Sequence, residues 1–211
     1  MEIKYQFSPS LLNQFAMYLT EEGYEKQGET IPYVTFQKLI DSINKVPYAT
    51  TEAQQKGIDF ENEVIALAKG ETQTLAGMEP AYKDCLIEIT QRLPAYFTAQ
   101  KKVQRQHEDI LFYGFCDVVG AGRIVDIKTS GQAYQFGKFL KSHQNLYLWA
   151  LEKQGYTSME YLQTNFKNVY TEEYGLDYDF TPLLQQMKDF AEFCEENREL
   201  ITNPKTFNFR Y

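Results

Sequence analysis

The sequence predicts an α/β domain in which a mixed central β-sheet is flanked by helices. Three observations predict this class: helical apolar spacing up to about residue 93, three consecutive strand patterns within residues 96–129, and a mixture of helical and strand patterns after them. Strands in the middle of a chain bury their apolar faces under the helices on either side in sequence. The 211 residues contain no repeat, low-complexity tract or linker. We therefore expect one domain over residues 1–211, large enough for a sizeable core.

Four helices are predicted in the first half of the chain. Ser8 followed by Pro9 is typical of a helix start, because a capping side chain precedes a proline at the first helical position. Gly70 marks the end of the third helix. The four predicted helices cover residues 8 to about 19, 35–44, 51–69 and 80–93.

Strand patterns begin at about residue 96. Gly120-Ala121-Gly122 is a turn signal between two apolar runs and predicts a hairpin, and Lys167-Asn168 predicts a second one. A helix is expected over residues 135–154, ending at Gly155, and a closing helix begins at Thr181-Pro182 and continues to about residue 201. The predicted strands cover residues 96–106, 110–119, 123–129, 159–166 and 169–174.

The first hairpin is predicted to bring two acids together. A two-residue loop at Ala121-Gly122 makes Asp117 face Asp126, and makes Lys128 face Phe115. Facing side chains lie ~5 Å apart on one side of a sheet, and two carboxylates at that distance repel unless a cation lies between them. Asp117 also shares its face with apolar residues, where a charge is unfavourable. A divalent metal ion would resolve both conflicts. The apolar neighbours on that face are Leu111, Tyr113 and Phe115.

Two further ionisable side chains are candidates for the same site. Lys128 shares a face with Asp126, and the strand around them is apolar on both sides, as buried strands are. A half-buried lysine beside two acids suits the orientation of a nucleophile and the neutralisation of negative charge. Glu61 falls within the apolar stripe of the predicted helix 51–69. Its carboxylate either lies partly exposed at the edge of the stripe or converges on Asp117 and Asp126.

Gln144 and Tyr147 share an apolar helix face with Leu148 and Leu151. Gln144 is therefore either a satisfied core amide or a site residue, and Tyr147 either a packing residue or a site residue. The only two histidines, His107 and His143, have no catalytic partner by spacing, so we expect both at the surface.

Composition narrows the classes of function. With 43% apolar residues, no apolar run near the ~18 residues of a membrane span and no signal pattern, the chain is expected to be soluble and cytoplasmic, without membrane contacts. Three dispersed cysteines without zinc-type spacing indicate a reducing compartment. The net charge of −8, from 21 basic and 29 acidic residues, is unfavourable for a nucleic-acid partner. Metal ions and a local groove can supply positive charge that this sum conceals. Five basic residues flank the proposed site in the sequence, and they form either a local track for phosphates or scattered solvated charge. They are Lys101, Lys102, Arg105, Lys138 and Lys141.

Five short motifs follow one another in a characteristic order. They are S-x-S-x-L-x-x-F (Ser8 to Phe15), G-x-x-F followed by an acid (Gly57 to Glu61), G-x-x-D (Gly114 to Asp117), D-x-K-T (Asp126 to Thr129) and Q-x-x-Y (Gln144 to Tyr147). In this order they resemble the PD-(D/E)xK nuclease superfamily, and in particular its RecB-like branch. The motifs span residues 8–147, about two thirds of the chain.

This resemblance implies a restriction-endonuclease-like core and hydrolysis of phosphodiester bonds that leaves 5′-phosphate and 3′-hydroxyl ends. Ligands made only of oxygen fit Mg²⁺ or Mn²⁺. By the resemblance, Asp117, Asp126 and the backbone carbonyl of Ile127 would hold the metal, and Glu61 would reach the same ion or a second one. Lys128 would position or activate the attacking water. Ser10, Gln144 and Tyr147 would support the site and the DNA strand.

Two departures from the family pattern qualify these expectations. Many RecB-like proteins carry a histidine near the position of Glu61, and this helix has none. Members that bind an iron–sulfur cluster use four cysteines, so this chain is not expected to hold one. The resemblance favours an exonuclease acting on DNA ends in repair or recombination. The alternatives are a catalytically silent relative that binds nucleic-acid ends or a partner protein, and a structure-specific endonuclease or RNA-directed nuclease. A homo-oligomer and a subunit of a larger complex are equally open.

Overall fold

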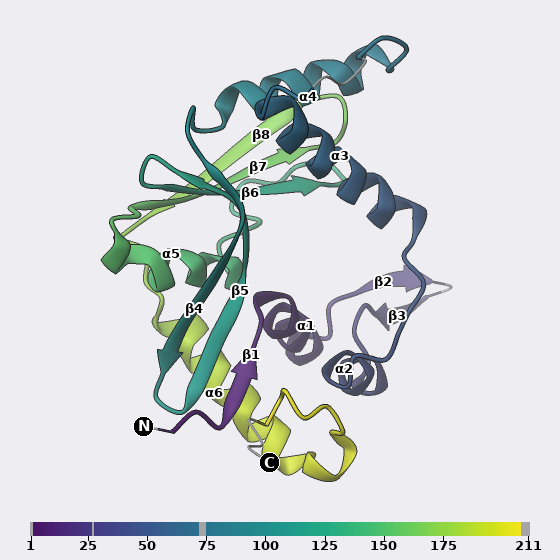
Figure 1. Cartoon of the computed structure of the whole chain (residues 1–211). Helices are drawn as coiled ribbons and strands as arrows, with labels where there is room; N and C mark the ends of the chain where they lie inside the picture. Colours follow the sequence, from purple (N-terminus) through teal and green to yellow (C-terminus); the bar gives the residue numbers. More distant parts are fainter. Residues whose placement is uncertain (1, 27, 72–74, 208–211) are drawn as a thin grey trace.

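The chain folds around a six-stranded mixed sheet in the computed structural model, which describes residues 2–26, 28–71 and 75–207 (Figure 1). The strands are β1 (Tyr5–Phe7), β2 (Gly23–Lys26), β3 (Glu29–Pro32), β4 (Thr98–His107), β5 (Ile110–Gly120), β6 (Arg123–Thr129), β7 (Ser158–Thr164) and β8 (Val169–Gly175). The main sheet has the order β1-β5-β6-β7-β8, with β4 along β5, and β2-β3 is a separate hairpin. β1 with β5 and β6 with β7 are parallel pairs, and the other pairs are antiparallel.

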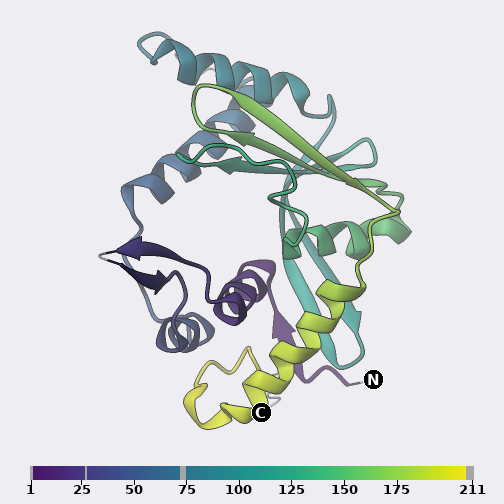
Figure 2. The ribbon, with the colours of Figure 1, turned by 180° about the vertical axis from the view of Figure 1, so that it is seen from behind.

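The helices cover both faces of this sheet, as the sequence predicts. They are α1 (Pro9–Thr20), α2 (Phe36–Ile43), α3 (Glu52–Ala68), α4 (Pro80–Arg92), α5 (Leu146–Leu151) and α6 (Thr181–Glu196). Three 3₁₀ turns are η1 (His143–Asn145), η2 (Glu152–Gln154) and η3 (Arg198–Leu200). Figure 1 and Figure 2 show α3 and α4 over β6–β8, with α5 and α6 on the other side of the sheet. The architecture is compatible with a restriction-endonuclease-like core.

Consecutive residues of the strands belong to different hydrophobic clusters. Ile124 packs in the cluster of α1, α5 and α6, whereas the next residue, Val125, packs with α3 and α4. Tyr161 and Leu162 divide in the same way. Since successive strand side chains point to opposite faces, both faces of the sheet are buried. This explains the apolar pattern of β6 on both sides.

Most predicted elements are confirmed within about two residues, including both hairpins. The predicted helix over residues 135–154 is wrong in its first half, where the chain forms turns before η1 and the short α5. The side chain of Asn145 donates to the carbonyls of Phe139 and Leu140, which holds that segment in a loop. The sequence also gives no signal for β1, because its three residues depend on a partner more than 100 positions away. None of the described helices is long and apolar enough to cross a membrane.

Candidate active site

The main sheet splits beside Asp117. β4 runs along one edge of β5, while the other edge is shared by β1, at residues 110–112, and β6, at residues 118–120. Among the described strands, none pairs with residues 113–117 on that second edge. On the other edge, β4 pairs with Cys116 and Val118 but not with Asp117. Gln100, the β4 residue at this position, has a φ of 50°. Positive φ is uncommon outside glycine and requires support from surrounding structure, so this level is a candidate functional position.

The hairpin register is confirmed, but the facing pair of acids is not. Val118 pairs with Val125, which is the predicted register, and both loop residues have positive φ as short hairpin loops require. The ladder ends at this pair, because β5 turns away toward β1 while β6 continues along β7 (Figure 1). Asp117 and Asp126 are therefore not a ladder pair. Instead, the backbone N–H of Ile127 donates to Oδ2 of Asp117 at 2.9 Å.

The face of β5 that carries Asp117 is not the apolar face that we expected. Phe115 on this face is 52% exposed, whereas the neighbouring Cys116 is buried. The more exposed face therefore bears Asp117, and the expected conflict between its charge and apolar neighbours is wrong. The unfavourable environment of Asp117 comes from its burial at the split of the sheet and from the negative charges of Asp126 and Glu61.

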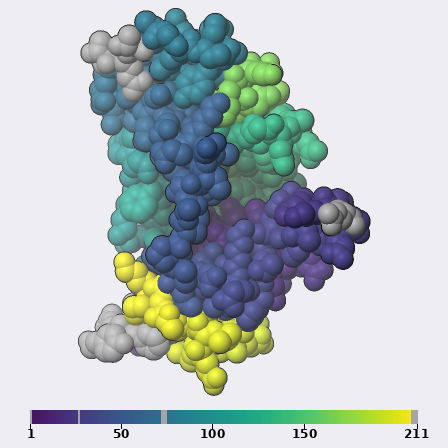
Figure 3. Space-filling view, turned by 90° about the vertical axis from the view of Figure 1, so that its right-hand side faces the viewer, coloured from purple at the N-terminus to yellow at the C-terminus, as the bar shows by residue number. Residues whose placement is uncertain are grey.

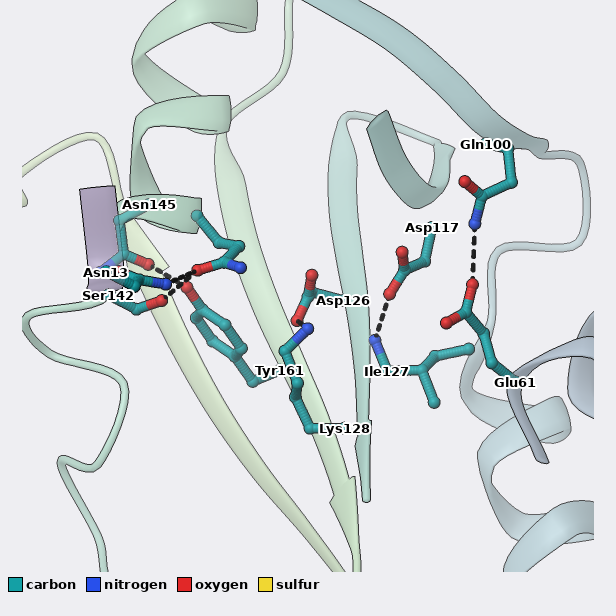
Figure 4. Close-up of polar contacts among 11 residues, drawn as sticks. Asn13, Glu61, Gln100, Asp117, Asp126, Ile127, Lys128, Ser142, Asn145 and Tyr161 are labelled. Atoms are coloured by element: carbon teal, nitrogen blue, oxygen red, sulfur yellow. Dashed lines mark hydrogen bonds and ion pairs between the residues drawn. The ribbon is translucent and has the colours of Figure 1, made fainter. Parts of the chain in front are cut away.

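Asp126 and Lys128 lie on one face of β6 and form an ion pair (Figure 4). Lys128 Nζ lies 2.5 Å from Oδ2 of Asp126, whose residue is only 3% exposed. Within the described residues, this buried oxygen has no hydrogen bond of ordinary geometry, and the ammonium of Lys128 lies beside it. A carboxylate in this state is a strong acceptor for any further cation.

Helix α3 brings Glu61 to the same place. The helix starts at a capping box between Thr51 and Gln54 and passes close to the end of β6 at Gly57. A Cβ atom at Gly57 would lie 2.6 Å from Oγ1 of Thr129, so a larger residue would push the helix away. Glu61 is one turn further along, and the side chain of Gln100 donates to its Oε1 at 2.7 Å (Figure 4).

The four ionisable groups act on one another electrostatically. Burial raises the pKa of Asp117 well above its ordinary value and the charge of Asp126 raises it further, while Lys128 opposes the rise. Burial also raises the pKa of Glu61, with Lys128 again opposing and Asp126 reinforcing. Burial lowers the pKa of Lys128, but the charges of Asp126 and Asp117 outweigh it and hold that pKa above its ordinary value. Three acids thus share one ammonium, an excess of negative charge that favours a bound cation.

The donor set fits a hard divalent cation in its chemistry. Glu61, Asp117 and Asp126 supply carboxylate oxygens, the backbone carbonyl of Ile127 could add a fourth oxygen, and neither histidine nor cysteine belongs to the set. In the described part of the chain, no three acidic, histidine or cysteine side chains are gathered closely enough to enclose an ion as they stand. Each of the three acids meets a protein donor instead, respectively Gln100, the N–H of Ile127 and Lys128.

The remaining motif residues connect the site to the core. Tyr147 is buried, and Gly114 makes room for its ring, because a Cβ at Gly114 would lie 2.5 Å from the hydroxyl oxygen. Gln144 lies in η1, not in the helix, and its Oε1 accepts hydrogen bonds from Asn13 and Ser142 at 2.7 and 2.6 Å. This amide ties α1 to η1 and is not in hydrogen-bond contact with the acids.

The Gly114→Ala substitution should lower the free energy of unfolding by about 1–3 kcal/mol, since the added methyl overlaps the Tyr147 ring. Chemical denaturation of Gly114→Ala, with Gly131→Ala as the control, measures this. No atom lies within 4 Å of a Cβ at Gly131, so the control should be near wild type. Adding Tyr147→Ala to Gly114→Ala should cost less than the sum of the two single changes. Full additivity would contradict the contact.

A groove of about 530 Å³ runs beside these groups. Its lining includes Ser10 of α1, Tyr48 of the α2–α3 linker, Glu61 of α3, and Lys128 of β6. Figure 3 shows this side of the molecule, with the linker and the start of α3 standing across the hollow. Ser10 is therefore placed at the groove with Glu61 and Lys128, while the buried Asp126 lies beneath the surface.

Two of the five basic residues considered for a phosphate track make other contacts in the fold. Arg105 stacks on Trp149 and pairs with Glu152, and Lys101 lies over the ring of Tyr156. These two side chains pack against α5, η2 and Tyr156 and do not line the groove. Lys102, Lys138 and Lys141 do not line the groove.

Two residues near the site, Gln100 and Gln163, carry no signal in the sequence. Gln100 carries no motif and was hidden in the polar alternation of β4. Gln163 pairs in register with Lys128, and both of its side-chain polar atoms are buried without a hydrogen bond. His143, expected at the surface, is buried, and burial lowers its pKa to about 4. Its backbone N–H donates to Oδ1 of Asn13 at 2.9 Å, and its ring Nδ1 lies 3.0 Å from the same oxygen. These tertiary contacts are not visible in the sequence.

Comparisons with known proteins identify relatives of the fold. No protein-family model matches the chain, and no curated protein matches it significantly. The solved structure of the protein SSO0001 is similar over 92% of this chain and 78% of its own, with 11% identity and a TM-score of 0.52. A protein from Eubacterium rectale named "putative exonuclease" is similar over 95% of this chain and 82% of its own, with 13% identity and a TM-score of 0.50. At such identities the likeness concerns the fold, which is the mixed-sheet α/β architecture described above.

Proposed function

We propose that this protein is a metal-dependent DNA nuclease of the RecB-like type, acting as an exonuclease on DNA ends. The observation that carries the proposal is the convergence of Glu61, Asp117, Asp126 and Lys128 from three separate elements at the split of the sheet. Gathering a buried acid, Asp126, and two partly buried acids, Glu61 and Asp117, around one lysine is costly for a protein that gains only stability from them. Such costs are typical of sites that bind or react.

The acids would hold the metal ion. Asp117 and Asp126 would be its ligands with the carbonyl of Ile127, and Glu61 would reach the same ion or another one. Mg²⁺ or Mn²⁺ at this place would activate water and stabilise the charge on the phosphate under attack. The oxygens of Asp126 need no further desolvation for this role, because they are already buried.

Lys128 would act as a cation in the reaction. In the metal-free protein the neighbouring acids hold the pKa of Lys128 above its ordinary value, so its side chain is an ammonium at neutral pH. It lines the groove and is anchored by Asp126, which fixes the direction from which it can meet a phosphate oxygen or a water.

Exonuclease action on DNA is supported by the resemblance and by the name of the structural neighbour from Eubacterium rectale. The net charge of −8 favours the second candidate, a catalytically silent relative that binds an end or a partner protein. Retention of all three acids and the lysine favours the enzyme.

A cleavage assay separates these candidates. End-labelled linear duplex, covalently closed duplex and single-stranded DNA are incubated with Mg²⁺, with Mn²⁺ and with EDTA. We expect release of label from linear substrates with either metal, no release in EDTA, and little action on closed circles. Cleavage that persists in EDTA, or no cleavage of any substrate with either metal, would contradict the proposal.

A further inference from the structure

A glutamine lies beside Lys128 in the sheet. Gln163 of β7 pairs in register with Lys128 of β6, and Tyr161 pairs in the same way with Asp126. Register partners in a sheet point to the same side, and neighbouring strands lie about 4.8 Å apart. The side chain of Gln163 therefore starts next to that of Lys128, on the face that also carries Asp126.

The loop between β6 and η1 covers Gln163. Tyr170, its register partner on β8, stacks on the ring of Tyr134 with 4.4 Å between the ring centroids. Tyr161, which precedes Gln163 on the same face, stacks on Phe139 at 4.2 Å. Two aromatic pairs therefore enclose the amide, and Gln163 is only 1% exposed. An enclosed position of this kind ordinarily holds an apolar residue.

The amide of Gln163 has no partner at this position. Neither its Oε1 nor its Nε2 has a hydrogen bond with any of the described residues, although both atoms are buried. Polar neighbours on the same face are paired, since the hydroxyl of Tyr161 donates to Asn145 and Glu172 accepts from two tyrosine hydroxyls. Unpaired buried polar atoms are rare and lower stability. A free amide here therefore indicates a partner that arrives in another state of the site.

Lys128 occupies an oxygen that the proposed metal ion would need. Its Nζ lies 2.5 Å from Oδ2 of Asp126. Two positive charges at one carboxylate oxygen repel each other, so the ammonium has to give way when that oxygen holds an ion. The lysine stem is flexible, and the side chain is 35% exposed, so it is free to turn. The neighbouring strand then offers an acceptor that is still free, Oε1 of Gln163.

We propose that Gln163 is a positioning residue for Lys128, and that its Oε1 accepts the ammonium once a divalent cation has taken Oδ2 of Asp126. This second position separates the ammonium from the ion and keeps Nζ at the wall of the groove that Lys128 lines. The inference rests on the proposed function, and it adds to that site a residue that belongs to none of the five motifs.

Gln163→Met tests the inference without DNA. Methionine has a similar size but no comparable acceptor, so the ammonium would stay on Asp126 and compete with the metal ion. Isothermal titration should show that this variant binds Mn²⁺ about 10–100-fold more weakly than wild type. The melting temperature of Gln163→Met in EDTA should equal or exceed that of wild type, because an unpaired buried amide is removed.

Gln14→Met is the matched control. Gln14 also has a buried Oε1 without a partner among the described residues, but it lies on α1 and does not line the groove. Its replacement removes an unpaired acceptor elsewhere in the fold, so Gln14→Met should bind Mn²⁺ like wild type.

Lys128→Met shows whether the effect of Gln163 passes through the ammonium. In that background no ammonium competes for Asp126, so the addition of Gln163→Met should leave the Mn²⁺ affinity unchanged. An equal loss of affinity in both backgrounds would make Gln163 a structural residue and overturn the inference. Wild-type Mn²⁺ affinity in the single variant Gln163→Met would overturn it as well.

Cleavage separates the inference from the proposed function. At saturating Mn²⁺, Gln163→Met should lower kcat on linear DNA about tenfold with little change in KM, because the ammonium is present but no longer held in place. If wild type binds Mn²⁺ and cleaves DNA and Gln163→Met matches it in both, the inference fails and the nuclease proposal stands. If Mn²⁺ affinity depends on Gln163 through Lys128 but no substrate is cleaved, the nuclease proposal fails and the positioning role stands. Wild type that binds no Mn²⁺ would overturn both.

Discussion

Asp126→Asn and Lys128→Ala should each reduce DNA cleavage to background, a loss of about 10²–10⁴-fold. Asp126 is buried and forms an ion pair with Lys128, so its replacement removes the charge that would hold both the metal and the ammonium. Lys128→Ala removes the cation that lines the groove. Initial rates on end-labelled linear duplex with saturating Mg²⁺ give the comparison.

The controls separate lost chemistry from lost structure. Asp84→Asn and Lys102→Ala change exposed residues of the same types outside the groove and should cleave normally. Circular dichroism should show that both site variants stay folded. Lys128→Arg keeps the positive charge with a different shape and should recover less than wild-type activity. Normal cleavage by folded Asp126→Asn or Lys128→Ala would remove the basis for the proposed function.

Asp117→Asn should stabilise the metal-free protein at neutral pH. Burial and the charge of Asp126 raise the pKa of Asp117 in the folded state. The folded state therefore binds this proton more tightly than the unfolded chain, whose aspartates have a pKa of about 3.9. The stabilising effect of that proton is complete below this unfolded value and is lost as pH rises through the folded pKa. At neutral pH the wild-type acid is thus a destabilising charge, which asparagine lacks.

Thermal unfolding in EDTA measures this effect. The melting temperature of Asp117→Asn should exceed that of wild type at pH 7.5 by roughly 2–4 °C for each kcal/mol gained. The difference should shrink as pH falls toward 4, because the wild-type carboxyl then becomes protonated. Asparagine keeps an oxygen that can accept from the N–H of Ile127, so that hydrogen bond is not the variable. A sharply lower melting temperature for the variant would show that the Asp117 carboxylate is stabilising as it stands.

Local patterns in the sequence predict the strands that carry the site but not their divergence. The turn at Ala121-Gly122 sets the pairing of Val118 with Val125. The same register extended by one step predicts a facing pair of Asp117 and Asp126, and there it fails. The failure has a non-local cause, because β1 takes the edge of β5 that β6 leaves. No pattern within one hairpin contains that information.

Two motif glycines are needed because another part of the chain packs closely against each of them. α3 approaches Thr129 at Gly57, and the ring of Tyr147 lies on β5 at Gly114. The need for glycine at these positions could not be derived from the sequence, because each contact joins residues more than 30 positions apart. Gln100, Gln163 and the linker residue Tyr48 belong to no motif. Their relation to the site depends on burial and on pocket walls that only the assembled fold provides.

Manganese binding tests the central claim most directly, since it needs no DNA and no knowledge of the reaction. Isothermal titration of metal-free wild type with Mn²⁺ should give saturable binding, weakened at least about tenfold in Asp126→Asn and unchanged in Asp84→Asn. The same titration of wild type without any heat of binding up to millimolar Mn²⁺ would contradict the account, because the acids at the split of the sheet would then not form a metal site.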